Sequence, residues 1–558
     1  YTYVTEFNNF ATKLYSDWSD NFSTEIGISY KDVSNTSETN SDIGSVTVEE
    51  YFRGPSYVFG QDEFRHANVS ENQNTIVSLD ATYLLGDHEI KFGAQYESLK
   101  LYNLFAANSL GSWEFDKISD FEDKEVGEFR GRYDFSYQNA FTNNINDTEY
   151  DITREQLAFY VEDTFYLTDD LEITAGIRYE SLSAGDTPTL NTGFQETYGH
   201  TNQENLDGLD IILPRLGFQW FASDDLTVRG GIGRFQGGIP NVWYNNPFQK
   251  DGITLVAATS DAIGEHFAAN GGIVENFQVP QSIKDSLVKG KGSTNYTDPN
   301  FELPSSWRAQ LGFEYTLDLG AIGDDFKWSA EAAYEKKENE AVWENTAIRK
   351  SGDLTDGERI INESIYEDPY DDNFDIMMTN ADDDGTSLIL TTSLAKNWDN
   401  GINMMMSYTN QNIEDNHAGS SSRAQSNYKH NIIKNRNQNF VERGHYEIEH
   451  SFKLNLGYTA EFFAGYNTRF DMFFERRSGR PYSYVMGMYK DDDLGDSVDF
   501  FSNSAYLAYI PSGADDPNVN WEKSKISWDQ LSFLMDEAGI AATGKIIDRN
   551  SHSQPWVT

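Results

Sequence analysis

The histidines are the first candidates for chemistry, because imidazole binds metals and transfers protons near neutral pH. The sequence contains nine of them, and His430, His445 and His450 form the closest group along the chain. Their spacing does not match HExxH or a comparable set of metal ligands. We interpret them as solvated or strand-face residues. The sequence predicts no enzyme, with no catalytic residue, no metal ligand and no cofactor.

Two further segments resemble binding loops only in part. GGIGRFQGG (230–238) is rich in glycine but lacks the GK[ST] ending of a phosphate loop, so its glycines are interpreted as strand residues. NADDDG (380–385) resembles the first half of a calcium loop, but Thr391 stands where that loop requires a bidentate acid. We interpret this segment as a solvated turn. Loose binding of divalent cations to the acidic loops is the alternative.

An aromatic segment is the first candidate for ligand binding. IPNVWYNNPF (239–248) starts a long polar region, and its rings at Trp243, Tyr244 and Phe248 are suited to stacking on an organic ligand. The alternative is that these rings pack against each other and their neighbours within the loop, which is the commoner role of loop aromatics. The sequence leaves both roles open.

A basic cluster is the second candidate, because it interrupts an otherwise acidic chain. Arg476, Arg477 and Arg480 follow one another closely, and guanidinium groups bind carboxylates and phosphates in a bidentate manner. We predict that Arg477 and Arg480 hold an anionic group of a ligand or of lipopolysaccharide. Pairing with acidic side chains of neighbouring loops is the equal alternative.

The charge of the chain excludes one class of partner. Asp and Glu number 90 against 42 Lys and Arg, which gives a net charge of −48. Nucleic acid requires a basic surface, so we predict no nucleic-acid partner. A solvated, self-repelling surface is one interpretation of the acidity, and concentration of cations is another. The chain has no cysteine, and no apolar run approaches the ~20 residues of a membrane helix.

The elements that must position these residues have period two. In LAFYVEDTFYLTDDLEITAGIRYES (157–181), apolar and polar residues alternate on both sides of Asp169 and Asp170, which predicts a β-hairpin. The same pattern occurs seven times, and together the hairpins predict about fourteen strands, with a further strand starting at Trp556. The breaks lie at 16–20, 85–88, 168–170, 222–225, 318–325 and 397–400, and within 445–479.

The connections alternate strictly between short and long. The long ones are acidic, and they lie at 35–71, 105–150, 185–210, 239–304, 345–385, 413–444 and 480–553. An outer-membrane barrel has short periplasmic turns and long outer loops, whereas a soluble sandwich has no reason to place every long loop at one end.

The residues predicted to face lipid in the hairpin at 157–181 are Leu157, Phe159, Val161 and Ile173. Those predicted to face the lumen are Glu162, Thr174 and Arg178.

One long connection contains a helix signal. In SWDQLSFLMDEAGI (527–540), Ser527 and Gln530 have the spacing of a capping box, and Gly539 follows as a stop. The sequence therefore predicts a helix between them.

Several phrases of the sequence resemble a known family. LPRLGFQWFASDDLTVRGGIGRFQGGIPNVW (213–243), RSGRPYSYV (477–485), AYIPSGADDPNV (508–519) and DRNSHSQPW (548–556) are similar to the Oar-like TonB-dependent receptors of the bacterial outer membrane. REQLAFYVEDTFYLTDDLEITAGIRYE (154–180) resembles the barrel of TonB-dependent receptors generally. The resemblance covers essentially the whole chain, as barrel only.

This resemblance implies a transmembrane antiparallel β-barrel of about 22 strands, filled by an N-terminal plug domain. It also implies capture of a peptide or other organic nutrient by the outer loops, and import driven by TonB through a TonB box and its inner-membrane energising complex. Outer-membrane lipid and lipopolysaccharide would surround the barrel. No plug or TonB box precedes Tyr1, and no closing strand follows Thr558. We therefore expect residues 1–558 to be the barrel portion of a longer protein.

Two other functions are compatible with the same pattern. A passive porin or a structural or adhesive barrel would share the hairpins and would conduct ions without TonB. A soluble acidic β-protein, such as an adhesin or a sugar-binding module, would be extracted without detergent.

Overall fold

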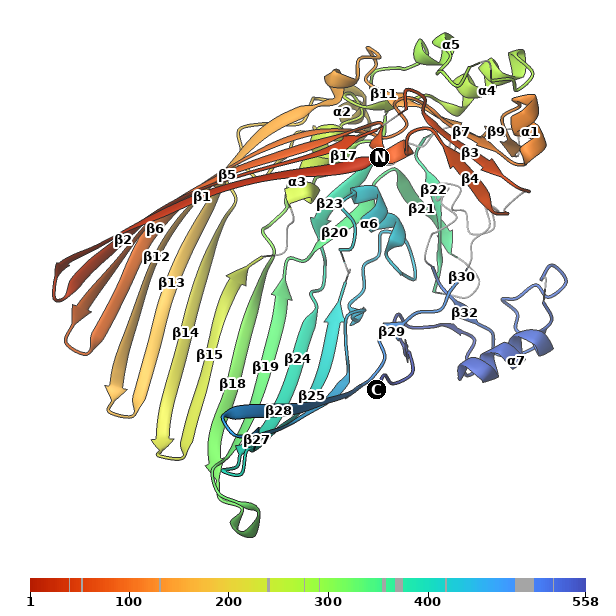
Figure 1. Cartoon of the computed structure of the whole chain (residues 1–558). Helices are drawn as coiled ribbons and strands as arrows, with labels where there is room; N and C mark the ends of the chain where they lie inside the picture. The colour runs from red at the N-terminus through yellow and green to blue at the C-terminus, as the bar shows by residue number, and fades with distance from the viewer. Residues whose placement is uncertain are drawn as a thin grey trace.

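The dominant element is one large antiparallel sheet that curves as a wall (Figure 1). The structure is a computed structural model that describes residues 1–39, 41–51, 54–129, 132–237, 241–274, 276–290, 292–353, 358–366, 375–416, 419–486, 506–524 and 526–558. The sheet has fifteen strands in the order β1-β2-β5-β6-β12-β13-β14-β15-β18-β19-β24-β25-β27-β28, with β26 paired to β25. Strands that follow each other in the chain also lie next to each other in the sheet. This up-and-down order is the simplest way to pair successive hairpins.

The long strands of the wall have the following bounds: β1 (Thr2–Ser19), β2 (Phe22–Glu38), β5 (Ala67–Leu85), β6 (His88–Ala106), β12 (Tyr150–Thr168), β13 (Leu171–Ser183), β14 (Asp210–Ser223), β15 (Leu226–Gln236), β18 (Ser305–Leu317), β19 (Phe326–Glu338), β24 (Thr386–Asn397), β25 (Ile402–Asp415), β27 (His450–Phe463) and β28 (Tyr466–Arg477). All seven predicted hairpins are confirmed. Their turns lie together at one end of the wall, and the long connections lie at the other (Figure 1).

Several strands are longer than the sequence pattern predicts. β5, β6 and β12 have 19 residues each, whereas a strand that crosses a membrane needs about 9–11. The additional residues include the polar stretch SENQN (70–74) near the start of β5, where apolar and polar residues do not alternate. The register of β5 with β6 nevertheless runs unbroken from Ala67 to Leu85. The outer ends of these strands therefore extend the wall beyond the length that a bilayer requires.

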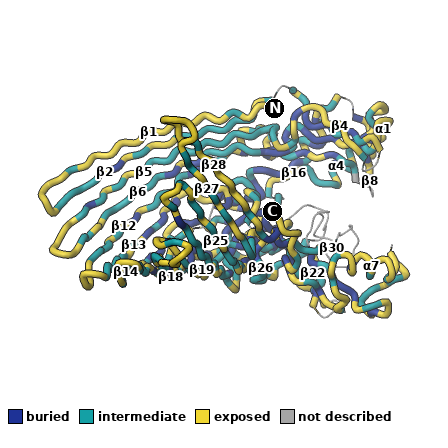
Figure 2. Tube along the Cα trace, turned by 60° about the horizontal axis from the view of Figure 1, so that its bottom comes forward, coloured by how far each residue is buried: buried dark blue, intermediate teal, exposed yellow. Residues whose placement is uncertain are grey.

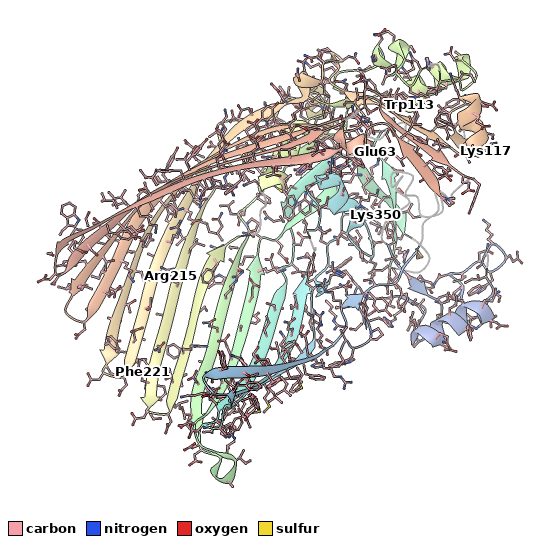
Figure 3. All side chains as sticks on the ribbon, in the orientation of Figure 1. Glu63, Trp113, Lys117, Arg215, Phe221 and Lys350 are labelled. Atoms are coloured by element: carbon pink, nitrogen blue, oxygen red, sulfur yellow. The ribbon has the colours of Figure 1, made fainter. Side chains whose placement is uncertain are left out.

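The two faces of the wall differ in polarity as predicted. The side chains of Leu157, Phe159 and Val161 are 43%, 50% and 45% exposed. Phe159 and Val161 lie opposite apolar or aromatic residues on both neighbouring strands, and Leu157 lies between Tyr96 and Ser181. On the other face, Arg215 Nε lies 2.5 Å from Glu162 Oε2 (Figure 3 labels Arg215). One face of the wall thus presents apolar surface outward, and the other carries ion pairs.

The long connections fold into compact structure at the outer end. Figure 2 shows buried residues concentrated there, while the hairpin turns are largely exposed. The shorter strands of this end are β3 (Ser45–Glu49), β4 (Ser56–Phe59), β7 (Ser112–Phe115), β8 (Glu128–Phe129), β9 (Arg132–Tyr133), β10 (Phe135–Ser136), β11 (Gln138–Asn139), β16 (Val256–Ala257), β17 (Asn295–Thr297), β20 (Ala341–Asn345), β21 (Ile348–Asp353), β22 (Ile360–Ser364), β23 (Ile376–Asn380) and β26 (Glu442–Arg443). The last connection contributes β29 (Pro481–Tyr482), β30 (Val485–Met486), β31 (Tyr506–Leu507), β32 (Tyr509–Ile510), β33 (Lys545–Ile546) and β34 (His552–Ser553).

The helices also belong to the long connections. They are α1 (Ile118–Asp123), α2 (Thr192–Tyr198), α3 (Asn241–Gln249), α4 (Ser260–Ala269), α5 (Gln281–Lys284), α6 (Ala424–His430) and α7 (Trp528–Ala538), with short 3-10 turns at Glu63–Arg65, Ile145–Thr148 and Gly320–Ile322. The predicted helix α7 is confirmed, with its capping box between Ser527 and Gln530 and with Gly539 in the left-handed conformation. Within the described residues, no helix is both long enough and apolar enough to cross a bilayer.

The predicted strand start at Trp556 is found as a single bridge. Arg477 N donates to Val557 O at 3.0 Å, and Val557 N donates to Arg477 O at 2.9 Å. This pair places the segment after β34 against the edge of β28 that faces away from β27.

One separate core stabilises the outer end away from the wall. Strands β3, β4, β7 and β10 form a small sheet whose Trp113 and Phe115 are fully buried. Figure 3 places Trp113 at the outer end, far from Phe221 near the turns. Val256, Ile263 and Phe267 from the connection after β15 complete this core. Connections that are distant in sequence therefore hold each other in place.

Candidate ligand-binding site

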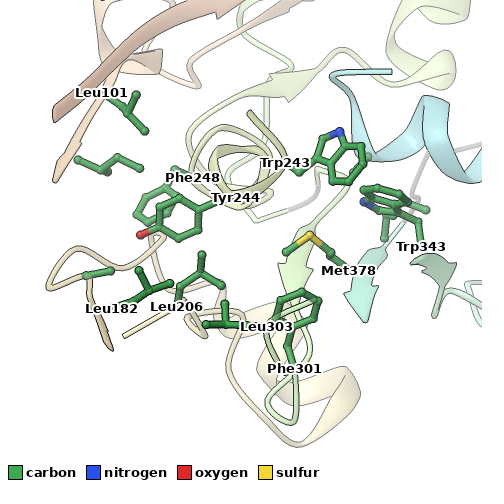
Figure 4. Close-up of a cluster of buried hydrophobic side chains, with 14 of the residues drawn as sticks. Leu101, Leu182, Leu206, Trp243, Tyr244, Phe248, Phe301, Leu303, Trp343 and Met378 are labelled. Carbon is green, nitrogen blue, oxygen red and sulfur yellow. The ribbon is translucent and has the colours of Figure 1, made fainter. Parts of the chain in front are cut away.

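The inner face of the wall becomes apolar at its outer end. Leu99 and Leu101 of β6, Ile152 of β12 and Leu182 of β13 follow the parity of the polar face, yet they are buried. They are covered by residues of α3, β20, β23 and α6, with which they form one cluster (Figure 4). We call this cluster and these four elements the cap. Because the cap packs on the inner face, the connections fold inward over the space that the wall encloses.

The three predicted aromatic residues lie inside the cap. Trp243, Tyr244 and Phe248 are 8%, 1% and 6% exposed, and all three belong to α3. Trp243 meets Trp343 edge to face at 4.5 Å between ring centroids, and its Nε1 donates to Ser421 O at 2.7 Å (Figure 4). Burial also raises the pKa of Tyr244 to about 12. In this arrangement the rings pack with neighbouring segments, and their role toward a ligand stays a prediction.

The predicted basic cluster lies elsewhere, where the chain leaves β28. Arg476 stands over the ring of Trp556 at 5.5 Å and Arg480 over the ring of Tyr446 at 5.6 Å. Arg477 Nε lies 3.9 Å from Glu475 Oε2. In the parts of the chain that the structure describes, no hydrogen bond, ion pair or ring contact joins Arg477 or Arg480 to the α3 aromatics. The two predicted groups are therefore separate, and ligand binding by the arginines stays a prediction.

A cavity of about 720 Å³ lies between the wall and α3. The wall contributes inward-facing residues from the outer ends of β1, β5, β6 and β12, among them Tyr3, Ser70 and Asn103. The opposite side is formed by Asn245 and Gln249 of α3 and by the segments 255–260, 292–295 and 422–425. We call this space the mouth cavity, because it lies at the end of the wall where the long connections gather.

The charge of the mouth cavity is opposite to that of the chain. Its lining includes three cations, Arg65, Lys250 and Arg423, and none of its 26 lining residues is Asp or Glu. A random sample of 26 residues from a chain with 90 acidic residues in 558 would include about four. The cavity is thus a basic pocket in an acidic protein. The positive potential within such a pocket attracts anions.

The two arginines are held without a carboxylate partner. Neither Arg65 nor Arg423 forms an ion pair with a described carboxylate, and Arg65 Nε is buried without a hydrogen-bond partner. Burial lowers the pKa of Arg423, and the charge of Glu63 raises it in part. Burial in turn raises the pKa of Glu63, a residue labelled at the outer end in Figure 3. Glu63 therefore offsets the desolvation of Arg423 only in part, and the partly buried arginines retain the capacity to bind an anion.

Amide groups complete the lining. Asn245 is 7% exposed, and its Oδ1 has no hydrogen-bond partner. Lys250 Nζ donates to Gln138 Oε1 at 3.0 Å, and Asn246 Nδ2 donates to Ser422 O at 2.8 Å. The second of these bonds joins α3 to the segment before α6. The amide side chains thus fix the shape of the mouth cavity and leave polar atoms for a ligand.

The basic residues of the mouth cavity were not predicted from the sequence. Arg65, Lys250 and Arg423 come from three different long connections, so their spacing in the chain carries no signal. The one available signal was Lys250, which follows the predicted aromatic segment by two residues. The sequence singled out the aromatic segment but predicted no helix there, and it left the role of the rings open. In the structure this segment forms α3, and its amide side chains line the cavity.

A buried carboxyl joins three connections beside the cap. Asp375 is 2% exposed and accepts hydrogen bonds from Tyr198 Oη at 2.7 Å, from Tyr366 Oη and from Thr294 N at 3.0 Å. Burial raises the pKa of Asp375, and these donors offset part of the increase. Burial and the charge of Asp375 also raise the pKa of Tyr198 and of Tyr366. We call this group the Asp375 latch.

We expect the Asp375 latch to make the outer end less stable as the pH rises. The folded state binds the proton of Asp375 more tightly than the unfolded chain does, and this difference stabilises the folded state. The stabilisation is fully present below the ordinary carboxyl pKa, and it is lost as the pH rises through the raised pKa of folded Asp375. Asp375→Asn removes the titration and retains an amide oxygen for Thr294 N. Thermal unfolding of the outer end of both proteins from pH 4 to 8 is the measurement. A wild-type-minus-variant stability difference that is constant across this range would contradict the prediction.

The comparisons with known proteins agree with this architecture. Residues 2–475 match the family model described as outer membrane beta barrel domain. A comparison with curated protein sequences finds no match. Among solved structures, the chain is similar to the outer membrane transporter YddB from Escherichia coli, with a TM-score of 0.52, 10% identity, and coverage of 87% of this chain and 52% of that chain.

Two further similar structures have lower TM-scores. The siderophore receptor PirA from Acinetobacter baumannii has a TM-score of 0.46 and 11% identity, with coverage of 89% of this chain and 53% of that one. A mutant of the ferric enterobactin receptor PfeA from Pseudomonas aeruginosa has a TM-score of 0.45 and 10% identity, with coverage of 86% and 50%. The chain spans about half the length of these structures, and at such identities the likeness is one of fold.

Proposed function

Because the chain belongs to the outer membrane beta barrel domain family and lies in the outer membrane, we propose that it is part of a TonB-dependent receptor that captures an extracellular organic ligand and imports it. The cap carries this proposal. Long connections fold inward over the inner face of the wall and enclose a mouth cavity of about 720 Å³. A simple diffusion pore has no need of a cap that binds, whereas a receptor requires a site that faces the outside.

The proposed mechanism contains no covalent chemistry. Ligand reaches the mouth cavity from outside and contacts α3, which is itself packed on the wall and on β20 and β23. Binding there would alter the packing of the cap, and this change would be transmitted to a plug domain within the barrel. TonB, energised by the inner-membrane proton gradient, would then release the ligand into the periplasm. In this proposal residues 1–558 supply the barrel and the outer site, and the plug with its TonB box lies outside them.

The printed names of the similar structures are compatible with this proposal. One is a transporter from Escherichia coli, one a siderophore receptor from Acinetobacter baumannii and one a ferric enterobactin receptor from Pseudomonas aeruginosa. Our proposal for the ligand is a peptide or another organic nutrient, in keeping with the resemblance to Oar-like receptors. Lipid and lipopolysaccharide are the proposed surroundings of the apolar face.

Uptake of dye-labelled short peptides tests the proposal. Cells that produce the full-length protein are expected to accumulate peptide, and accumulation is expected to stop when TonB is deleted or the proton gradient is collapsed. The physical reason is that a plugged barrel offers no continuous water path, so release requires work from outside the barrel.

A conductance measurement separates the receptor from a passive pore. The purified full-length protein is expected to be nearly silent in planar bilayers. Large, steady ion conductance combined with peptide uptake that persists without TonB would support a porin and would contradict the proposal.

A further inference from the structure

We propose that the mouth cavity binds the anionic end of its ligand, a carboxylate or phosphate group, through Arg65 and Arg423. This inference rests on the proposed function, because it names the chemical class of the ligand that the outer site takes. The basic cluster predicted from the sequence, Arg477 and Arg480, is a different place in the fold.

The first argument is the contrast of charge. The chain carries a net charge of −48, yet the mouth cavity has three cations and no acidic residue in its lining. An acidic protein repels anions from most of its surface, so an anion that reaches the outer end is attracted to the places where cations are grouped, of which the mouth cavity is one. The acidic surface thereby adds selectivity to the site.

The second argument is the state of the two arginines. Arg65 Nε is buried without a partner, and Arg423 has no described ion pair. A guanidinium presents a planar set of donors that fits a carboxylate or phosphate. A bound anion would supply the direct ion pair that neither Arg65 nor Arg423 forms with a described carboxylate, beyond the partial compensation of Arg423 by Glu63.

The third argument is the remainder of the lining. Asn245 Oδ1 has no partner although the residue is 7% exposed, and Asn68 and Asn103 stand on the wall side. Phe105 and Tyr150 add ring surface. Amides and rings beside cations suit an organic molecule with an anionic end better than a bare inorganic ion.

Binding of pyranine, an aromatic trisulfonate that stays in water, tests this proposal on the full-length protein in detergent. We expect saturable one-to-one binding, measured by fluorescence anisotropy. Arg65→Gln and Arg423→Gln are each expected to weaken it by about tenfold or more, because each removes a charge that is shielded from solvent. Arg423→Lys, which keeps the charge but loses the planar donor set, is expected to recover part of the affinity.

Arg349→Gln is the matched control. Arg349 also lies at the outer end, but outside the mouth cavity and paired with Glu363 at 2.7 Å, so the same change of charge there is expected to leave pyranine binding unchanged. The migration of unheated samples in gels verifies that each variant is folded. Absence of saturable binding, or equal binding by all variants, would overturn the proposal.

Competition identifies the anion. Displacement of pyranine by triglutamate but not by triglutamine or inorganic phosphate would indicate carboxylates, and displacement by inorganic phosphate would indicate phosphates. Failure of both anions in large excess would overturn the assignment.

The outcome is independent of the import test. If pyranine binding fails while uptake still requires TonB, the proposed anion site is contradicted and the receptor proposal is retained. If the anion site is found but uptake is independent of TonB, the receptor proposal falls and the binding site stands.

Discussion

Replacing Trp243 by alanine is expected to destabilise the cap by about 3–5 kcal/mol, the usual cost of removing a buried tryptophan side chain. Trp243 is 8% exposed, packs against Trp343 and donates its Nε1 hydrogen to Ser421 O. The alanine variant loses the buried indole surface, the contact with Trp343 and the hydrogen bond to Ser421 O, and it leaves a void between α3 and β20. Since α3 also forms one side of the mouth cavity, we expect the site to loosen together with the cap.

Hydrogen exchange followed by mass spectrometry measures this effect. Exchange in residues 241–249 is expected to accelerate by about 100-fold or more in the Trp243→Ala variant, the factor that corresponds to 3 kcal/mol. Trp18→Ala is the matched control, because Trp18 is 69% exposed at the turn end and does not belong to the cap. If Trp243→Ala leaves exchange in this segment unchanged, Trp243 does not hold α3, and a direct role toward ligand would then become the better interpretation.

The second large effect concerns the apolar face of the wall. Leu79→Arg is expected to destabilise the membrane-inserted barrel by about 2–4 kcal/mol, the cost of an arginine near the middle of the bilayer. Leu79 is 48% exposed on the face that carries Ala94 and Phe159, and it stands well away from the turn at Gly86. A charge at this position would have to leave water for lipid.

Ser78→Arg is the control with the same introduced side chain one residue away. Ser78 lies opposite Gly27 and Gln95 on the polar face, next to Asp80, so an arginine there remains in a polar environment. Unfolding of both variants by urea in lipid vesicles gives the comparison. Equal losses of stability in the two variants would mean that the apolar face is not the lipid-facing one.

The Asp375 latch and the cap have a shared consequence for the site. Segments 185–210, 239–304 and 345–385 meet at the Asp375 latch, and the cap adds 413–444. A ligand that moved α3 would therefore affect contacts that reach several connections at once. Such a coupled outer end has the property that a receptor needs in order to respond as a unit to occupancy.

The sequence by itself determined the wall. Period-two alternation in segments such as 157–181 requires a strand with one polar and one apolar face, and the Asp-rich breaks fix the hairpin register. Local chemistry also fixed the capping box of α7. These features need only residues that are neighbours in the chain or across one turn, so they can be predicted without tertiary structure.

Only the tertiary structure decided the site. The polar outer end of β5 pairs with β6 although its sequence does not alternate, because its neighbours in the sheet hold it in register. Trp243, Tyr244 and Phe248 became cap residues because four connections fold over the inner face and bury them. Arg65, Lys250 and Arg423 meet at one cavity from three different connections, and the connection of Arg65 is not part of the cap. Contacts among segments separated by more than a hundred residues depend on how the whole wall curves, and no local pattern in the sequence encodes that geometry.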